Sequence, residues 1–79
     1  MEKKEMALCD LPAGWKCRVK KLTAQGPVRR RMLDLGLISD TVVESLHKSP
    51  SGDPVAYLIR GAVIALRSDV ASTILVEAL

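Results

Sequence analysis

Turn-forming residues divide this sequence into short segments, and that division restricts the possible folds more than any other feature. Prolines and glycines gather at Pro12-Ala13-Gly14, within Lys48–Pro54 and at Gly61, and both residue types mark chain reversals. Between these turns apolar and polar residues alternate, which is the period of half-buried strands. The pattern predicts a mainly β protein with one or two short helices, arranged as a small, partly open barrel of five strands.

The predicted strands turn one set of apolar side chains inward and another outward. The strands are expected near residues 16–22, 41–47, 55–60, 63–66 and 73–77. Alternation directs these residues toward the core: Cys17, Val19, Val43, Tyr57, Ile59, Ile64, Leu66, Ile74 and Val76. It directs Val42, Leu58, Val63 and Leu75 outward. Because apolar residues left uncovered on a surface often mark a partner site, we expect a partner-binding module.

The segment Pro27–Leu35 is predicted to be helical. Pro27 suits the first helical position, where an N–H would have no partner in any case, and Gly36 suits the left-handed residue that ends a helix. Leu37 should then fold back onto the helix, as in a Schellman ending. The expected apolar stripe consists of Val28, Met32 and Leu35. A helix this short is not stable alone, so it must dock on another part of the protein.

Two polar segments are expected to be local structures. Asp53, in the turn Ser51-Gly52-Asp53-Pro54, is expected to accept hydrogen bonds from nearby backbone amides as in an Asx turn. Ser68 is expected to cap a single helical turn at Asp69–Ser72. Both features are interpreted as structural, with a functional role for the Gly52–Asp53 loop tip as the alternative.

Chain length and hydropathy restrict the class of protein. The chain has 79 residues, which suits one domain over 1–79 with its core at about 8–77. No apolar run approaches the roughly 20 residues of a membrane-spanning helix. The start, Met1–Glu5, mixes acids with bases and does not resemble a signal peptide. A cytoplasmic protein without membrane insertion is therefore expected.

The sequence offers few groups for catalysis or metal binding. Its one histidine is His47, and its two cysteines, Cys9 and Cys17, are eight positions apart with no CxxC pair. A structural zinc site needs four ligands, and no nucleophile–base set can be assembled convincingly from one histidine. We therefore expect no enzyme activity, no cofactor and reduced thiols. His47 and Asp53 are the weak candidates for a contact with Fe²⁺ or Zn²⁺.

Basic residues concentrate in the first half of the chain. Arg29-Arg30-Arg31 lies in the predicted helix, and Lys16, Arg18, Lys20 and Lys21 lie in the strand before it. Such a face could bind phosphates, or it could be a solvated face whose arginine stems cover apolar surface. The net charge is only +3 and the sole aromatic residues are Trp15 and Tyr57. The solvated face is favoured, and no nucleic-acid partner is expected.

An ordered series of short motifs resembles the FeoA family of ferrous-iron transport accessory proteins, from Leu8 to about Glu77. The motifs are Leu11-Pro12-Ala13-Gly14, Arg30-Arg31-Met32-Leu33-Asp34-Leu35-Gly36-Leu37, Pro50-Ser51-Gly52-Asp53-Pro54, Arg60-Gly61, Ala65-Leu66-Arg67, and Ala71 with Ile74 and Val76. Two positions depart from the family pattern: Ser39-Asp40 stands where Pro-Gly is usual, and Ser45 stands where an apolar residue is frequent.

The resemblance implies an SH3-like β-barrel with an inserted helix. It also implies a cytosolic accessory protein that binds and modulates the membrane iron transporter FeoB, at its cytosolic GTPase region. The same barrel occurs in metal-dependent repressors of the DtxR type, so the alternative is a regulator-like domain that binds nucleic acid or a transition metal ion. The predicted partner-binding residues are Arg30, Arg31, Gly52, Asp53 and Leu58. The oligomeric state is left open.

Overall fold

The computed structural model describes residues 5–79, and within this range the chain is mainly β, as the sequence predicts. The strands are β1 (Glu5–Ala7), β2 (Lys16–Leu22), β3 (Val42–Lys48), β4 (Val55–Ile59), β5 (Ala62–Leu66) and β6 (Ile74–Ala78). The helices are α1 (Gly26–Asp34) and α2 (Ser68–Ala71), with a 3-10 turn, η1 (Leu8–Asp10). The expectation that Met1–Glu5 is no signal peptide rests mostly on residues outside the described range.

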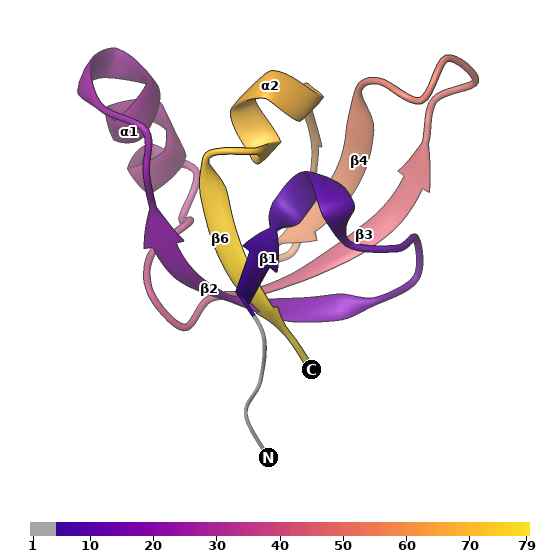
Figure 1. The fold of residues 1–79 in the computed structure, drawn as a ribbon, viewed down its shortest axis with the longest axis horizontal. Coiled ribbons are helices and arrows are strands. Elements are labelled where there is room, and N and C mark those ends of the chain that lie inside the picture. Colours follow the sequence, from indigo (N-terminus) through magenta and orange to yellow (C-terminus); the bar gives the residue numbers. More distant parts are fainter. Residues whose placement is uncertain (1–4) are drawn as a thin grey trace.

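The strands of residues 5–79 form one antiparallel sheet in the order β1-β6-β2-β3-β4-β5. The register shifts between Val19 and Lys21, where β2 pairs with β6, and between Ser45 and His47, where β3 pairs with β4. Such bulges bend a strand and increase its twist. In Figure 1 the bent sheet curves around α2 and η1, and β1 and β5 are its two edges. The sheet is barrel-like without being closed.

The core lies inside this curve and combines strand residues with residues of η1, the two helices and the loops. The fully buried side chains include Leu8, Leu11, Cys17, Val19, Met32, Leu37, Val43, Tyr57, Ile59, Ile74 and Val76. Tyr57 is the largest of them, and its hydroxyl donates to the Leu8 carbonyl at 3.5 Å. The inward set expected from alternation is thus buried, except that Ile64 is only half-buried against the core.

The sequence pattern misses one strand within the described residues. β1 is three residues long and pairs with β6 through Met6 opposite Val76. Three residues are too few to show a period, and β1 exists because β6 supplies backbone partners for it. The sheet therefore has six strands rather than the five predicted.

Helix α1 has the predicted ending but not the predicted burial. The Leu37 N–H donates to the Met32 carbonyl and the Gly36 N–H to the Leu33 carbonyl, both at 3.0 Å, which is the Schellman pattern. Among the residues of α1, however, only Met32 is buried, and Val28 is 43% exposed. The expected stripe of Val28, Met32 and Leu35 is therefore wrong at Val28. In Figure 1, α1 projects beyond the end of β2 rather than lying flat on the sheet.

Candidate functional site

A groove of about 540 Å³ lies between α1 and the end of β2, and we call it the α1–β2 groove. Its apolar wall includes Leu33 and Ile38, which are 41% and 48% exposed. Its polar wall carries Lys20, Lys21 and Arg29. Exposed leucine and isoleucine side chains beside a row of cations are typical of a surface that binds another macromolecule.

Local structure fixes both walls of the α1–β2 groove. The Arg29 guanidinium donates to the Leu22 carbonyl at 3.2 Å, which ties the start of α1 to the end of β2. On the other side, the Thr41 hydroxyl donates to the Gly36 carbonyl at 2.9 Å and holds the segment that follows the helix. The groove is therefore held by hydrogen bonds at both ends of α1 although most of the helix is exposed.

Gly36 is required where α1 turns back toward the sheet. Its φ of +94° lies in the left-handed region that other residues rarely adopt. A Cβ added there would also overlap the side chain of Arg60, which packs against the glycine. Gly36 thus places the exposed Ile38 beside Leu33 by permitting the sharp turn between them.

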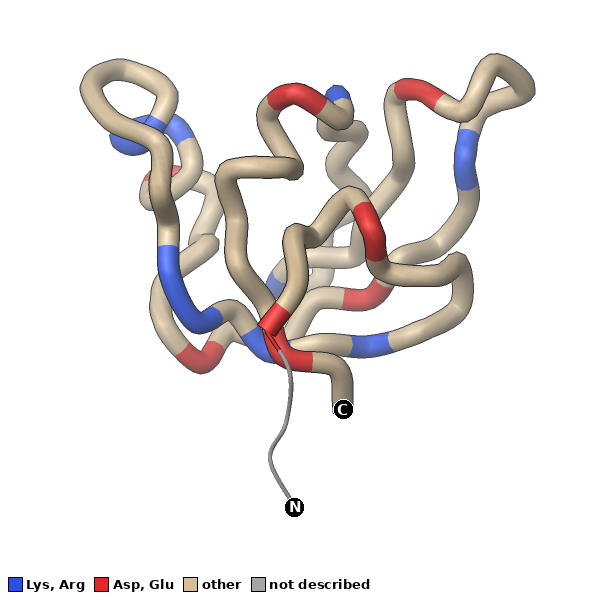
Figure 2. The backbone as a smooth tube through the Cα atoms, viewed as in Figure 1, with Lys and Arg blue, Asp and Glu red and all other residues tan. Residues whose placement is uncertain are grey.

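The α1–β2 groove has a positive balance of charge. Lys20 lies 3.8 Å from Asp40 in an exposed ion pair, but no carboxylate lines the groove among the described residues. Figure 2 shows lysine and arginine positions gathered along β2 and α1 on one side of the molecule. An exposed ion pair contributes little to stability, so these cations remain available to a negatively charged partner.

The five predicted partner-binding residues do not form one surface. Arg30 and Arg31 are exposed on α1, and Arg30 borders shallow hollows beside Gly26 and Leu33. Gly52 and Asp53 lie in the β3–β4 loop, on the opposite side of the view in Figure 1. Leu58 is half-buried on β4. The structure places these residues in three separate regions.

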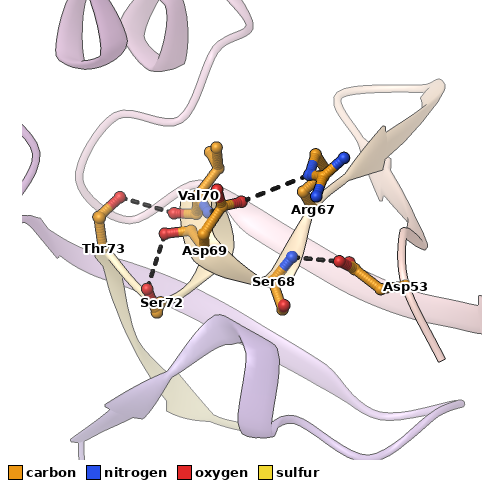
Figure 3. A network of polar contacts seen from close by, with 7 residues as sticks. All are labelled: Asp53, Arg67, Ser68, Asp69, Val70, Ser72 and Thr73. Atoms are coloured by element: carbon orange, nitrogen blue, oxygen red, sulfur yellow. Dashed lines mark hydrogen bonds and ion pairs between the residues drawn. The ribbon is translucent and has the colours of Figure 1, made fainter.

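Asp53 has a structural partner that differs from the predicted Asx turn. Its carboxylate accepts a hydrogen bond from the Ser68 backbone N–H at 2.8 Å, across fifteen positions of sequence (Figure 3). This contact ties the β3–β4 loop to the start of α2. Ser68 is itself the first residue of α2 and does not cap it: the N-cap is Arg67, which makes no side-chain cap bond. The expected helical turn is thus present as α2, whereas the Asx turn and the Ser68 cap are replaced by this one contact between distant segments.

Leu58 borders a second hollow, of about 270 Å³, on the outer face of the sheet. Val42 lines it and is 45% exposed, while Lys16, Glu44 and Arg60 supply charges of both signs. The outward direction predicted for Val42 and Leu58 is correct. This hollow is half the size of the α1–β2 groove, and its charge is mixed rather than positive.

The residues considered for metal contact do not converge. Among residues 5–79 no three His, Cys, Asp or Glu side chains lie close enough together to hold a metal ion. His47 is exposed at the end of β3, and the Asp53 carboxylate already accepts a hydrogen bond from the Ser68 N–H.

Burial raises the pKa of the Cys17 thiol to about 11. Burial also raises the pKa of Cys9, and the neighbouring Asp10 carboxylate raises it further. Both free thiols are therefore harder to deprotonate than an ordinary cysteine, which disfavours the thiolate form that ligates metals.

Comparison with known proteins identifies the family. A sequence model of the FeoA domain matches residues 6–78. The chain belongs to the FeoA family. No curated protein sequence matches it. This assignment confirms the resemblance drawn from the motif series, and it associates the chain with ferrous iron transport.

Solved structures of FeoA proteins share the fold. The FeoA protein of Chlorobium tepidum is 35% identical, with a TM-score of 0.87, and the match covers 94% of this chain and 70% of that one. A FeoA-like protein of Clostridium acetobutylicum is 34% identical, with a TM-score of 0.89 over 100% and 91% of the two chains. The zinc complex of Stenotrophomonas maltophilia FeoA, described as an SH3 domain protein, is 27% identical, with a TM-score of 0.81 over 90% and 88%. The predicted SH3-like fold is confirmed.

The residues that form the apolar wall of the α1–β2 groove are not among the partner-binding residues predicted from the sequence. Leu33 lies off the expected stripe of α1, and Ile38 follows the turn at Gly36. The sequence does contain a signal for Leu33: it is an apolar residue on the polar side of a short helix, and such a side chain faces solvent unless something covers it. Ile38 gives no such signal, because its exposure depends on the turn that precedes it.

Proposed function

We propose that this protein is a cytoplasmic accessory protein of ferrous iron uptake that binds the transporter FeoB at its cytosolic GTPase region and modulates it. The protein acts by contact and carries out no chemistry of its own. Membership of the FeoA family supports the link to iron transport. The S. maltophilia relative is described as a candidate activating factor of bacterial ferrous iron transport, which supports a modulating role. No helix within residues 5–79 is long and apolar enough to cross a membrane.

The α1–β2 groove is the observation that carries this proposal. Leu33 and Ile38 supply apolar contact area, and Lys20, Lys21 and Arg29 supply positive charge around it. Apolar contacts provide most of the free energy of association, whereas charges raise the rate of encounter and select the partner. A groove on so small a protein suits a transient contact, which buries less than about 1,200 Å² in total.

Titration of the isotope-labelled protein with the cytosolic region of FeoB tests the proposal. We expect amide resonances of α1, the end of β2 and the segment around Ile38 to shift. Leu33→Glu should remove the shifts, because it places a carboxylate where an apolar contact forms. Leu58→Glu is the matched control, since Leu58 borders the separate hollow on the sheet.

Two outcomes would contradict the proposal. Unchanged spectra at saturating FeoB would remove FeoB as the partner. Shifts around Leu58 and Gly52, lost in Leu58→Glu but kept in Leu33→Glu, would move the binding surface from the α1–β2 groove to two of the residues predicted from the sequence.

A further inference from the structure

The two edges of the sheet differ in how they are protected. β1 is three residues long and begins with Glu5, and short length and charge both discourage pairing with another strand. β5 has five residues, Ala62-Val63-Ile64-Ala65-Leu66, with no charge and no proline. Its register with β4 runs unbroken from Val55 opposite Leu66 to Ile59 opposite Ala62. β5 is therefore a regular, uncharged edge of the kind that accepts an additional strand.

The hairpin geometry shows which backbone groups β5 leaves unpaired. Arg60 and Gly61 connect β4 to β5 with φ values of 50° and 84°, the signs that a two-residue type I′ turn requires. Ile59 and Ala62 then form the hydrogen-bonded pair next to the turn, and pairs alternate from there. It follows that the N–H and C=O groups of Val63 and Ala65 point away from β4. No described residue hydrogen-bonds them.

Side chains around these groups leave the edge accessible. Val63 is 65% exposed, more than any other large apolar residue described, and Ala62 and Ala65 are exposed beside it. Val63 pairs with Leu58 across the β4–β5 ladder, so the two form a small apolar strip on the outer face. A strand added at the edge would place its own side chain against this strip.

Charge at the two ends of β5 indicates the chemistry of the added strand. Arg60 precedes the strand and Arg67 follows it, with no carboxylate between them in the sequence. Arg67 lies 3.8 Å from Asp69, but both side chains are about three-quarters exposed, and such a pair is weak enough to be exchanged. A complementary segment therefore carries carboxylates at its ends and uncharged residues in its middle.

We propose that the β5 edge binds an extended segment of a partner protein as a seventh, antiparallel strand. The N–H groups of Val63 and Ala65 donate to its carbonyls, and their C=O groups accept from its amides. Arg60 and Arg67 contact the carboxylates of acidic side chains near its two ends. This is the strand-addition mode of peptide recognition, in which main-chain bonds supply affinity and alternate side chains supply specificity. The surface is separate from the α1–β2 groove and does not depend on the identity of the partner bound there.

A second copy of this chain is a poorer occupant of the same edge. Antiparallel pairing of two β5 strands would bring Arg60 of one copy near Arg67 of the other, at both ends. An edge of five residues also provides only a small part of the about 800 Å² per partner that a stable dimer buries. Self-association through β5 is therefore an outcome against the proposal.

A synthetic peptide tests the edge directly. The probe is Glu-Asp-Val-Thr-Val-Thr-Val-Asp-Glu with blocked termini, and its comparator replaces the four acidic residues with lysine. Added to the isotope-labelled full chain, the acidic peptide should shift the amide resonances of β5 and slow hydrogen exchange of the Val63 and Ala65 amides. The lysine peptide should bind at least about tenfold more weakly, because two like-charge contacts replace two attractive ones.

Two substitutions complete the test, and the second has a matched control. Ala65→Pro removes an N–H that points away from β4, so the hairpin is kept, while peptide affinity should fall about tenfold with the lost donor. Val63→Gln should weaken binding similarly, because it removes the apolar contact without adding charge, whereas Val42→Gln, at an exposed valine on an inner strand, should not. Circular dichroism on each variant confirms that it is folded.

The proposal is overturned by any of four results. These are no shift at about 1 mM peptide, equal binding of the lysine peptide, shifts confined to α1, and binding that survives Ala65→Pro in the folded protein. It is also overturned if sedimentation shows self-association that Val63→Gln abolishes, since the occupant of the edge would then be a second copy.

Discussion

The barrel and helix α1 use their apolar residues in opposite ways. Strands β2, β3, β4 and β6 bury alternate residues, and the largest buried side chain, Tyr57, lies among them. α1 buries Met32 alone, and it leaves Val28 and Leu33 more than 40% exposed. Both regions contain leucine and valine, so the presence of these residue types does not distinguish them.

Because of this difference, one set of residues determines the stability of the fold and another determines its affinity for a partner. Burial of an apolar side chain contributes about 1.5–3 kcal/mol, and the barrel collects nearly all of that contribution. The exposed residues of α1 contribute little to the folded state, and their apolar area becomes useful only when a partner covers it. Substitutions in the barrel should therefore change stability, and substitutions on the exposed face of α1 should change affinity.

Tyr57→Ala should have the largest effect on stability. It removes a fully buried ring and its hydrogen bond to the Leu8 carbonyl, and such truncations cost about 3–5 kcal/mol. In a chain of this size that loss should unfold much of the population, as measured by urea denaturation. Tyr57→Phe keeps the ring and should cost about 1 kcal/mol. Equal losses in the two variants would mean that the ring is not the main contribution.

Alkaline pH should destabilise the barrel through two of its buried groups. Burial raises the pKa of Cys17 to about 11 and the pKa of Tyr57 to about 12. In the unfolded chain these groups have ordinary pKa values of about 9 for Cys17 and 10 for Tyr57. Their protonated forms therefore contribute fully to the stability of the folded protein below pH 9, and this contribution is lost as pH rises through 11 and 12. Urea midpoints measured across this range should fall in the native protein. They should fall less in a Cys17→Ala, Tyr57→Phe double variant, and parallel curves would contradict the assignment.

Gly36→Ala should destabilise the junction between the helix and the barrel. Alanine at a φ of +94° is strained, and its Cβ would displace the side chain of Arg60. The expected cost is about 1–2 kcal/mol, measured as a lower thermal midpoint. Gly52→Ala is the matched control, because Gly52 has a similar φ of +86° and open space around it. A loss in Gly36→Ala no larger than in the control would show that the Arg60 contact is unimportant.

Ser45→Ala should stabilise the barrel slightly. Ser45 is fully buried on β3, and its hydroxyl has no hydrogen-bond partner among the described residues. A buried polar group without a partner costs about 1–3 kcal/mol, and alanine removes it at the price of a small cavity. We expect a gain of about 1 kcal/mol in the free energy of unfolding. A loss of stability would show that the hydroxyl is hydrogen-bonded in solution.

Much of the barrel is predictable from the sequence because its signals are local. Alternation around Cys17, Val43 and Tyr57 identifies the buried face of three strands. The helix ending at Gly36 follows from the conformational freedom of glycine and the apolar residue after it. These features depend on neighbours within a few positions, and so the sequence contains them.

The α1–β2 groove, the Asp53 contact and strand β1 are less predictable because they depend on contacts that are not local. Asp53 bonds to Ser68, fifteen positions away, and nothing near Asp53 indicates that partner. β1 exists through its pairing with β6 at the other end of the chain. The exposure of Leu33 depends on how far α1 stands from the sheet, which the hydrogen bonds at Leu22 and Gly36 decide.

Two adjacent residues of α1, one buried and one exposed, test whether burial decides between an effect on stability and an effect on binding. Met32 is buried and Leu33 is 41% exposed, so Met32→Ala should cost about 2–5 kcal/mol and Leu33→Ala no more than about 0.5 kcal/mol. Leu33→Ala should nevertheless weaken binding to the FeoB cytosolic region about tenfold, as expected for a central apolar contact. Urea denaturation and calorimetric titration on both variants provide the measurement. If Leu33→Ala lowers stability as much as Met32→Ala, α1 lies against the barrel in solution and the α1–β2 groove is closed.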